Sequence, residues 1–584
     1  MCGIWFCLTN KNLTQQELDE MNEKANRLEK RGPDNTKEIN LKLGKLHLYL
    51  KFFRLSIRDV SHAGDQPFIL NLPDKTIYLM CNGEIYNYEY LVEKYNLHDK
   101  LHSHSDCEIL IHLYQILGME KLYEELTEGN NVSGEYAMII LEESNIDNSV
   151  TISTCRDPGG VRPLYQAHWF SFDSPEMMLV YSSELKGIPF IDLPDFKMCK
   201  QYNPYHYVQL KYSTLTGENI NIIAEHKSFK YFNKKDDYIE RPITIYDEEE
   251  ACKLIRETLT QCVFDRMKSD RPMMFMLSGG LDSSLCAALG AFYNKLNDLP
   301  QIKTMCVGME GGTDEPYAKL VAEHINSNHI HVKCTNDEFL NKMEQTIYVN
   351  ESFDITTDRA SVGQLISAEK IAELTDSKVV IIGDYSDEIT GGYKETCLAP
   401  TTHDFKERIY ELIDEIYMYD AQRADRCIAY NGLESRCPFG DHRFIKLYLS
   451  IDPELRKPRL INGTSIEKYL LRKAFSGTGL LPDTVLWRQK EAFSDGVSSL
   501  KKSWYQILQE QINDMYTDEE YEDKRTNYTH MQPYTKESLY YREIFCKYYS
   551  DKVSNVIPHF WLPKWGQSKD PSARTLENYI KEEH

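Results

Sequence analysis

The chain has 584 residues, which is more than one hydrophobic core usually supports, so we expect two or three domains. Its content of 41% hydrophobic and 27% charged residues is ordinary for a globular protein and excludes a fibrous or wholly disordered chain. The formal net charge of −23 disfavours binding to nucleic acid or to an anionic membrane, so a phosphate ligand would need local groups to hold it.

Cys2 is the first residue of the chain with a clear chemical use. Removal of Met1 would leave one residue with both a thiol and a free α-amine, and that amine can accept a proton as the sulfur attacks a carbonyl group. The 15 cysteines show no C-x-x-C pair and no regular spacing, so we expect reduced thiols and a cytoplasmic protein. We expect no signal peptide and no membrane span, because no run approaches the roughly 18–20 apolar residues that a span needs.

The first 213 residues carry short β-like runs separated by turn residues. These runs cover residues 77–81, 136–141, 150–154, 178–182 and 207–211. A helix is expected to start near Ser105-Asp106-Cys107-Glu108, which has the spacing of a capping box. We therefore predict a mainly antiparallel N-terminal domain over residues 1–213 and a linker over residues 214–234.

The pattern changes after residue 234, where apolar strands alternate with longer helical segments. The predicted strands cover residues 272–277, 303–308 and 378–382, and the helical patterns cover residues 285–293, 318–325 and 364–374. This alternation predicts a parallel sheet with crossover helices. We place an α/β domain at residues 235–550 and a tail at residues 551–584, in which Trp561 and Trp565 indicate docking.

The most specific motif is Leu-Ser-Gly-Gly-Leu-Asp-Ser-Ser at residues 277–284. It follows a predicted strand and opens a predicted helix, so backbone N–H groups and the positive end of the helix can meet a phosphate group. Ser278, Ser283 and Ser284 can add hydroxyl donors, and Asp282 suits a magnesium ion. The chain has neither a Walker A motif nor G-x-G-x-x-G, which disfavours a Walker NTPase and a dinucleotide dehydrogenase.

This motif resembles the pyrophosphate loop of the N-type ATP pyrophosphatases. Together with Cys2 it makes the chain similar to the glutamine-hydrolysing asparagine synthetases of the B type. Segments 31–34, 54–57, 82–87 and 105–106 are similar to the class II glutamine amidotransferase domain. The resemblance implies an α+β N-terminal domain, in which an Ntn-type antiparallel sandwich lies between helices, followed by an α/β domain with a mostly parallel sheet.

The resemblance also implies roles in the N-terminal domain. Cys2 would be the nucleophile, and the Asn82 side chain with the Gly83 N–H would form the oxyanion hole. Such roles are chemically reasonable, because acyl transfer needs donors aimed at a developing oxyanion. The expected glutamine-binding residues are Arg54, Leu55, Ser56, Ile57, Asn82, Gly83, Glu84 and Asp106.

In the C-terminal domain the resemblance implies a nucleotide site. Thr356, Arg359 and Lys490 would meet phosphate groups, and Asp282 and Asp387 would hold Mg²⁺. Cations that converge on a leaving pyrophosphate would stabilise the charge that develops in the transition state. The expected ATP-binding residues are Met276, Leu277, Ser278, Gly279, Gly280, Asp282, Ser283, Ser284, Val307, Ile382 and Gly383.

One loop departs from the family pattern. The family usually has serine-glycine-glutamate-glycine where this chain has Ile382-Gly383-Asp384-Tyr385, and Asp384 would take the catalytic carboxylate's place. Aspartate is one methylene shorter than glutamate, and tyrosine is far larger than glycine. Smaller departures at Ser435, Cys437 and Gly440, where the family commonly has alanine, valine and leucine, are interpreted as packing changes.

The expected activity is ATP-dependent synthesis of asparagine from aspartate with ammonia from glutamine, through a β-aspartyl-AMP intermediate. The expected partners are glutamine, aspartate, ATP and Mg²⁺, with no nucleic acid or membrane, and a homodimer is open beside a monomer. One alternative is an adenylating ligase for another carboxylate, against which Cys2, Asn82 and Asp106 argue, since β-lactam-forming relatives typically lose the cysteine. Another is a catalytically weak homologue with a binding or regulatory role, which Asp384 and Tyr385 keep open.

Overall fold

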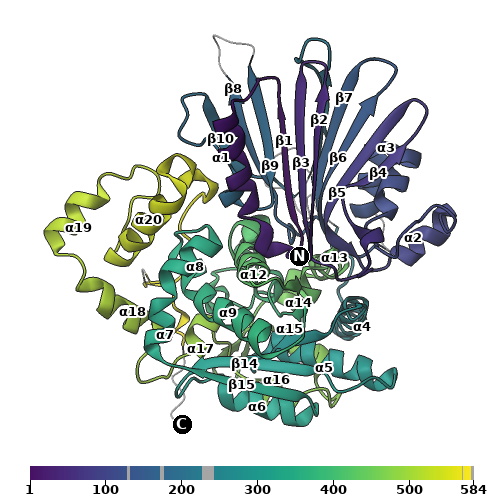
Figure 1. Ribbon diagram of the computed structural model, residues 1–584. Helices are drawn as coiled ribbons and strands as arrows, with labels where there is room; N and C mark the ends of the chain where they lie inside the picture. The colour runs from purple at the N-terminus through teal and green to yellow at the C-terminus, as the bar shows by residue number, and fades with distance from the viewer. Residues whose placement is uncertain (128–131, 171–175, 205, 227–241, 569, 580–584) are drawn as a thin grey trace.

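The computed structural model describes residues 1–127, 132–170, 176–204, 206–226, 242–568 and 570–579. Long strands make up the N-terminal half of the molecule, and helices around a smaller sheet make up the C-terminal half (Figure 1). Part of the predicted linker, residues 227–234, lies outside the described residues. Within the described residues, no helix has both the length and the apolar character needed to cross a bilayer.

The N-terminal half contains two six-stranded sheets in which all neighbouring strands are antiparallel. The first has the order β10-β8-β9-β1-β3-β2 and the second β12-β11-β7-β6-β5-β4. The strands of the first sheet are β1 (Gly3–Thr9), β2 (Asn35–Leu43), β3 (Leu46–Arg54), β8 (Tyr165–Phe170), β9 (Met177–Ser182) and β10 (Phe196–Gln201). Those of the second are β4 (Phe68–Asn71), β5 (Lys75–Ile85), β6 (Gly134–Ser144), β7 (Ser149–Arg156), β11 (Tyr207–Ser213) and β12 (Asn219–His226). Because β12 pairs with β11, the second sheet continues past residue 213, the predicted end of the domain.

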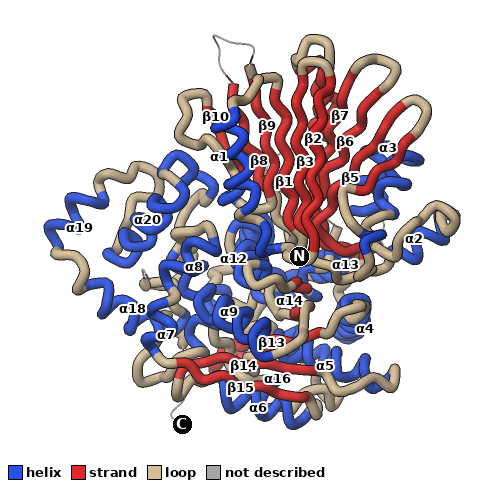
Figure 2. The backbone as a smooth tube through the Cα atoms, viewed as in Figure 1, coloured by secondary structure: helices blue, strands red, loops and turns tan. Residues whose placement is uncertain are grey.

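The two sheets pack face to face between helices, which gives four layers (Figure 2). Strand β1 is buried on both faces, because its side chains alternate between two apolar cores. Ile4 and Phe6 share one core with Met80 of the second sheet, whereas Trp5 packs in the core that contains Met21 of α1 (Gln15–Asn26). On the other side, α2 (Tyr88–Tyr95) and α3 (Ile109–Thr127) cover the second sheet. The antiparallel sandwich expected from the sequence is confirmed.

The C-terminal half is built on a parallel sheet with the order β15-β14-β13-β16-β17. Its strands are β13 (Met273–Met276), β14 (Lys303–Met309), β15 (Asn328–Cys334), β16 (Val379–Ile381) and β17 (Glu434–Arg436), and a separate hairpin pairs β18 (Arg459–Ile461) with β19 (Thr464–Ile466). The helices in chain order are α4 (Glu248–Arg266), α5 (Leu281–Leu296), α6 (Glu315–His324), α7 (Asn336–Asn341), α8 (Met343–Asn350), α9 (Ile355–Leu374), α10 (Ser386–Thr390), α11 (Thr402–Glu415), α12 (Asp420–Ala429), α13 (His442–Leu449), α14 (Pro453–Arg456), α15 (Tyr469–Phe475), α16 (Asp483–Leu486), α17 (Phe493–Gly496), α18 (Trp504–Asn513), α19 (Asp518–Arg525) and α20 (Lys536–Tyr549). The predicted α/β architecture is therefore confirmed.

The strand order of this sheet defines where a ligand can bind. From β13 the chain moves outward through β14 to β15, and it returns to the other side of β13 to form β16 and β17. The loops after β13 and β16 therefore leave neighbouring strands in opposite directions and open a crevice at the carboxyl edge of the sheet. The motif at residues 277–284 and the loop at residues 382–386 both lie at this edge.

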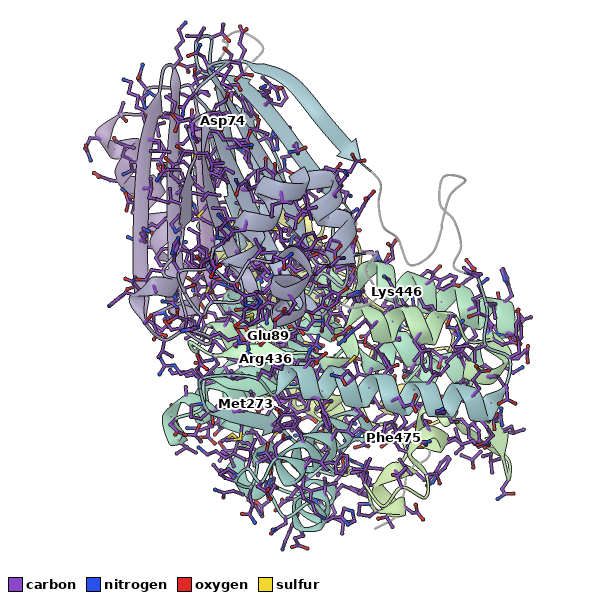
Figure 3. All side chains as sticks on the ribbon, turned by 90° about the vertical axis from the view of Figure 1, so that its right-hand side faces the viewer. Asp74, Glu89, Met273, Arg436, Lys446 and Phe475 are labelled. Atoms are coloured by element: carbon purple, nitrogen blue, oxygen red, sulfur yellow. The ribbon has the colours of Figure 1, made fainter. Side chains whose placement is uncertain are left out.

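Buried ion pairs join the two halves. Arg31 contacts Asp425 at 2.6 Å, and Arg266 contacts Glu135 at 2.8 Å, with all four side chains almost fully buried. Arg436 of β17 lies at the junction between Glu89 above and Met273 below (Figure 3). Loss of one partner would leave an uncompensated buried charge, so these pairs hold the halves in a defined relation.

Candidate functional site

The nucleophile expected from the sequence lies directly before β1. The Cys2 N–H donates to Asn82 Oδ1 at 2.9 Å, and the Cys2 Sγ lies 3.7 Å from the Leu55 carbonyl oxygen. With Met1 attached, burial raises the pKa of the Cys2 thiol to about 11. The Met1 ammonium is itself buried and donates to the carbonyl oxygen of Leu433 in the C-terminal half, at 3.3 Å.

Asn82 and Gly83 lie side by side on β5 at the expected oxyanion position. The Asn82 side chain is fully buried, and within the described part of the chain its Nδ2 has no hydrogen-bond partner. A buried amide donor without an acceptor is costly, so its retention points to an acceptor that arrives with a ligand. Gly83 pairs with Tyr136 of β6, and a Cβ at Gly83 would lie only 2.2 Å from the Glu135 carbonyl oxygen.

The expected glutamine-binding residues gather around this position, but Arg54 is already engaged. Its guanidinium donates to the Ser61 carbonyl oxygen and to Asp65 Oδ1, both at 2.6 Å, and also to the Asp59 carbonyl oxygen. Arg54 therefore fixes the loop at residues 59–65, and Leu55, Ser56 and Ile57 follow it past Cys2. The Ser56 carbonyl oxygen accepts a 3.0 Å hydrogen bond from Arg271 of the C-terminal half.

Glu84 and Asp106 form a buried pair of carboxylates close to Asn82 and Gly83. Burial, followed by the charge of Asp106, raises the pKa of Glu84 well above its usual range. Burial likewise raises the pKa of Asp106 to about 6, although Arg58 and the backbone N–H of Ile85 act in the opposite direction. Two buried carboxylates that repel each other favour a cationic ligand group between them.

Arg58 lies beside these two carboxylates and was missed by the sequence analysis. Its charge acts on both Asp106 and Glu84, and its Nη2 lies 3.2 Å from Glu89 Oε1. The Nη1 is buried and has no hydrogen-bond partner in the described residues, so this cation remains available to an anionic group. Its position directly after the segment at residues 54–57 was the signal that could have drawn attention to it.

The second expected site is a pocket at the carboxyl edge of the parallel sheet. Helix α5 begins directly after Gly280 and points its N-terminus at the pocket, without a capping side chain. Ser278 and Ser283 hold the loop in shape through a 3.0 Å contact between their hydroxyl groups. The predicted residues that line the pocket are Met276, Leu277, Ser278, Gly280, Asp282, Ser283, Val307, Thr356, Ile382, Gly383, Asp384, Asp387 and Lys490.

Three predicted residues do not line this pocket. Gly279 has a φ of 77°, and a Cβ there would lie 2.4 Å from the Ala318 backbone nitrogen. The absence of a side chain at this position therefore lets α6 pack closely against the loop. The Ser284 hydroxyl is fully buried on α5. The Arg359 guanidinium pairs with Glu537 of α20 and with Asp570 of the tail, at distances of 2.6–2.9 Å.

The carboxylates of Asp282 and Asp387 lie close together, as predicted, and two lysines contact them. Lys468 Nζ lies 2.7 Å from Asp282 and 2.5 Å from Asp387, while Lys490 Nζ lies 2.6 Å from the other oxygen of Asp387. Burial raises the pKa of Asp387, but Lys468 and Lys490 outweigh it and lower the pKa to about 2. Lys468 was missed because it lies far along the chain and in no motif, and its left-handed φ of 54° is a property of the folded backbone alone.

The loop that departs from the family pattern, at residues 382–385, places Asp384 at this pocket and the side chain of Tyr385 against the N-terminal half. The Asp384 carboxylate lines the pocket and pairs with Arg423 at 2.8 Å, and Arg423 is held in turn by Asp420 at 2.6 Å. Tyr385 is buried, and its ring packs on Gly440, where a Cβ would lie 3.3 Å from three ring atoms. The expectation that the change at residue 440 concerns packing is confirmed, because a leucine there would occupy the space of the ring.

Comparisons with known proteins identify both domains of the chain. Residues 1–226 match the family model of the glutamine amidotransferase domain, and residues 254–409 and 396–565 match that of asparagine synthase. A probable glutamine-hydrolysing asparagine synthetase of Acanthamoeba polyphaga mimivirus is 36% identical over 583 residues, which cover 99% of this chain and 100% of the relative. The glutamine-hydrolysing asparagine synthetases of Gallus gallus and Homo sapiens are 36% and 34% identical, with 99% of each chain covered. The chain therefore belongs to the family of glutamine-hydrolysing asparagine synthetases.

Proposed function

We propose that this chain makes asparagine from aspartate in an ATP-dependent reaction that uses ammonia released from glutamine. The observation that carries the proposal is the presence of two half-sites in one chain. One combines Cys2 with Asn82, whose Nδ2 has no hydrogen-bond partner among the described residues, and the other combines the loop after β13 with the lysine and aspartate cluster. The first set of groups suits acyl transfer from an amide, and the second suits the release of pyrophosphate from a nucleotide.

At the first site, Cys2 attacks the side-chain amide carbon of glutamine. Once Met1 is removed, the nitrogen that now lies 2.9 Å from Asn82 Oδ1 becomes an amine that can take the thiol proton. The Asn82 Nδ2 and the Gly83 N–H donate to the oxyanion, and the α-amine passes the thiol proton to the side-chain nitrogen as the C–N bond breaks and ammonia leaves. Water then hydrolyses the thioester to glutamate and restores the thiol. Glu84 and Asp106 hold the substrate ammonium, and Arg54 and Arg58 supply positive charge for its carboxylate.

At the second site, the β-carboxylate of aspartate attacks the α-phosphorus of ATP, and pyrophosphate leaves. Ammonia then attacks the acyl carbon of β-aspartyl-AMP, which gives asparagine and AMP. Lys490 and Lys468 offset the negative charge of the departing pyrophosphate. Ammonia released to water would be protonated and non-nucleophilic, so it crosses the buried junction between the two halves.

Mg²⁺ fits this site as a partner of the nucleotide. Asp282 and Asp387 both contact Lys468 Nζ, so their carboxylates converge on one point that a cation already occupies. Mg²⁺ is typically held by one or two carboxylates together with substrate phosphates, and these two residues would supply the protein's share. The bound ion would neutralise phosphate charge.

The pocket geometry also bears on the alternative of a catalytically weak homologue. Asp384 is one methylene shorter than the glutamate of the family, yet its carboxylate faces the pocket and is oriented by Arg423. This contact supports an active synthetase. Assay of the purified protein with amide-labelled ¹⁵N-glutamine, aspartate and MgATP should give ¹⁵N-asparagine, glutamate, AMP and pyrophosphate. Formation of ADP, or of AMP without asparagine, would refute the proposed reaction.

The raised pKa of Asp106 predicts a pH dependence for glutamine use. The group is protonated below its pKa of about 6, and in that form it cannot pair with the substrate ammonium. We expect kcat/KM for glutamine hydrolysis to fall by roughly tenfold per pH unit below about pH 6 because of this group. An Asp106→Asn variant should have a low kcat/KM that lacks this step, and an unchanged step in that variant would contradict the assignment.

A further inference from the structure

Tyr385 is a single residue that contributes to the nucleotide pocket and also contacts the N-terminal half. Its backbone lies between Asp384 and the start of α10, which carries Asp387, so it belongs to the wall of the nucleotide pocket. Its side chain leaves the pocket, and the hydroxyl donates to the carbonyl oxygen of Gly159 in the N-terminal half, at 3.0 Å. Only 1% of the residue is exposed, so this contact is made away from water.

The backbone of Tyr385 is held in an unfavourable conformation. Its φ of 78° lies in the left-handed region, which is unfavourable for a residue with a Cβ. Such strain persists only where the surrounding structure holds it. Here the ring is fixed against Gly440 and the hydroxyl against Gly159, on opposite sides of the junction.

On the other side of the contact, short hydrogen bonds lead back to the oxyanion strand. The Asp157 N–H donates to the Tyr136 carbonyl oxygen at 2.7 Å, and the Tyr136 N–H donates to the Asp157 carboxylate at 3.2 Å. Gly159 and Gly160 form the turn that follows Asp157, where the Gly160 N–H donates to the Asp157 carbonyl oxygen. Tyr136 is the direct cross-strand partner of Gly83.

We propose that Tyr385 is a positioning residue that couples the two active sites, so that ATP and aspartate at one site accelerate glutamine hydrolysis at the other. Its hydroxyl ties the loop of Asp384 and Asp387 to the turn that supports Tyr136 and Gly83. Ligands that fix the loop thereby favour one arrangement of the oxyanion strand, and the same contact transmits the effect in reverse. The inference rests on the proposed function, because it needs a glutamine site at one end and a nucleotide site at the other.

Tyr385→Phe tests the coupling, because it removes the hydroxyl and keeps the ring that fills the space beside Gly440. The measurement is the rate of glutamate formation from glutamine, with and without ATP and aspartate. We expect wild-type protein to be stimulated by about fivefold or more. We expect Tyr385→Phe to keep its unstimulated rate within about twofold and to lose most of the stimulation, whereas a ring that only fills space would leave the stimulation intact.

The double variant Tyr385→Gly with Gly440→Leu restores the residues common in the family and exchanges ring packing for leucine packing. It should fold and should also lack the stimulation, so it answers the question if Tyr385→Phe is unstable. Wild-type stimulation in both variants, or a wild type insensitive to ATP and aspartate, would overturn the coupling. Failure of the proposed function has a different signature, namely glutamate formation that persists after Cys2→Ala.

Discussion

A Cys2→Ala variant should lose glutamine-dependent asparagine formation by at least about 10³-fold while it keeps ammonia-dependent formation within about twofold. The thiol is the atom that forms the acyl bond, whereas the neighbouring thiols of Cys81 and Cys107 are buried, and Cys107 Sγ donates to the Gly83 carbonyl oxygen at 3.3 Å. The nucleotide pocket lies at the carboxyl edge of the parallel sheet, and Cys2 is not among its lining residues. The two nitrogen sources therefore separate the two half-reactions.

The matched control for this variant is Cys7→Ala. Cys7 lies on β1, the strand that follows Cys2, and is fully buried, but its side chain packs in the core beside α1. Its loss should lower the free energy of unfolding and leave glutamine hydrolysis intact. If both nitrogen sources fail in a folded Cys2→Ala protein, the division of labour between the two halves is wrong.

The removal of Met1 can be tested on the chain without any substitution. With Met1 attached, the Cys2 nitrogen is an amide, and its delocalised electron pair is not basic enough to take the thiol proton. Intact mass measurement will show whether Met1 is present, and chains that retain it should be inactive with glutamine and active with ammonia. A chain that retains Met1 and hydrolyses glutamine would exclude the amine as the base.

Local patterns predicted much of the fold from the sequence. The apolar runs at residues 77–81 and 136–141 are the centres of β5 and β6, and the alternation after residue 234 predicted the parallel sheet. Strand β2 was missed although Ile39, Leu41 and Leu43 alternate with polar residues and pack, partly buried, against the sandwich core. This apolar signal is short, because residues 35–38 of the strand are polar and take their extended form from pairing with β3, which a local window cannot show.

The site was predictable to the extent that it consists of contiguous motifs. The loop at residues 277–284 was expected from its motif, and the approach of Asp282 to Asp387 was expected from the family resemblance, which gave both residues to Mg²⁺. The contact of Arg359 with Asp570 was not, because it depends on where a tail more than 200 residues away docks. The fit of Tyr385 to Gly440 is likewise a contact between distant segments that only the folded chain brings together.

A Lys490→Met variant should show the opposite separation from Cys2→Ala. Lys490 Nζ lies 2.6 Å from Asp387 at the pocket wall, where the leaving pyrophosphate gathers negative charge. Loss of one preorganised charged donor typically costs about 10²–10³-fold in rate, so asparagine and AMP formation should fall by that factor with either nitrogen source. Lys468 still pairs with Asp282 and Asp387 in this variant, so the carboxylates keep a cation and the pocket keeps its shape.

The matched control is Lys473→Met, which removes a lysine of α15 that pairs with Glu248 and Glu249 away from the pocket. It should leave AMP formation within about twofold, because exposed pairs of this kind contribute little. Glutamate formation without ATP should be unchanged in both lysine variants, since Asn82 and Cys2 lie in the other half. A Lys490→Met protein that forms AMP at the wild-type rate would show that the lysine does not stabilise the transition state. A Lys490→Met protein that stops hydrolysing glutamine would show that the lysine acts through the junction between the halves rather than on the phosphate.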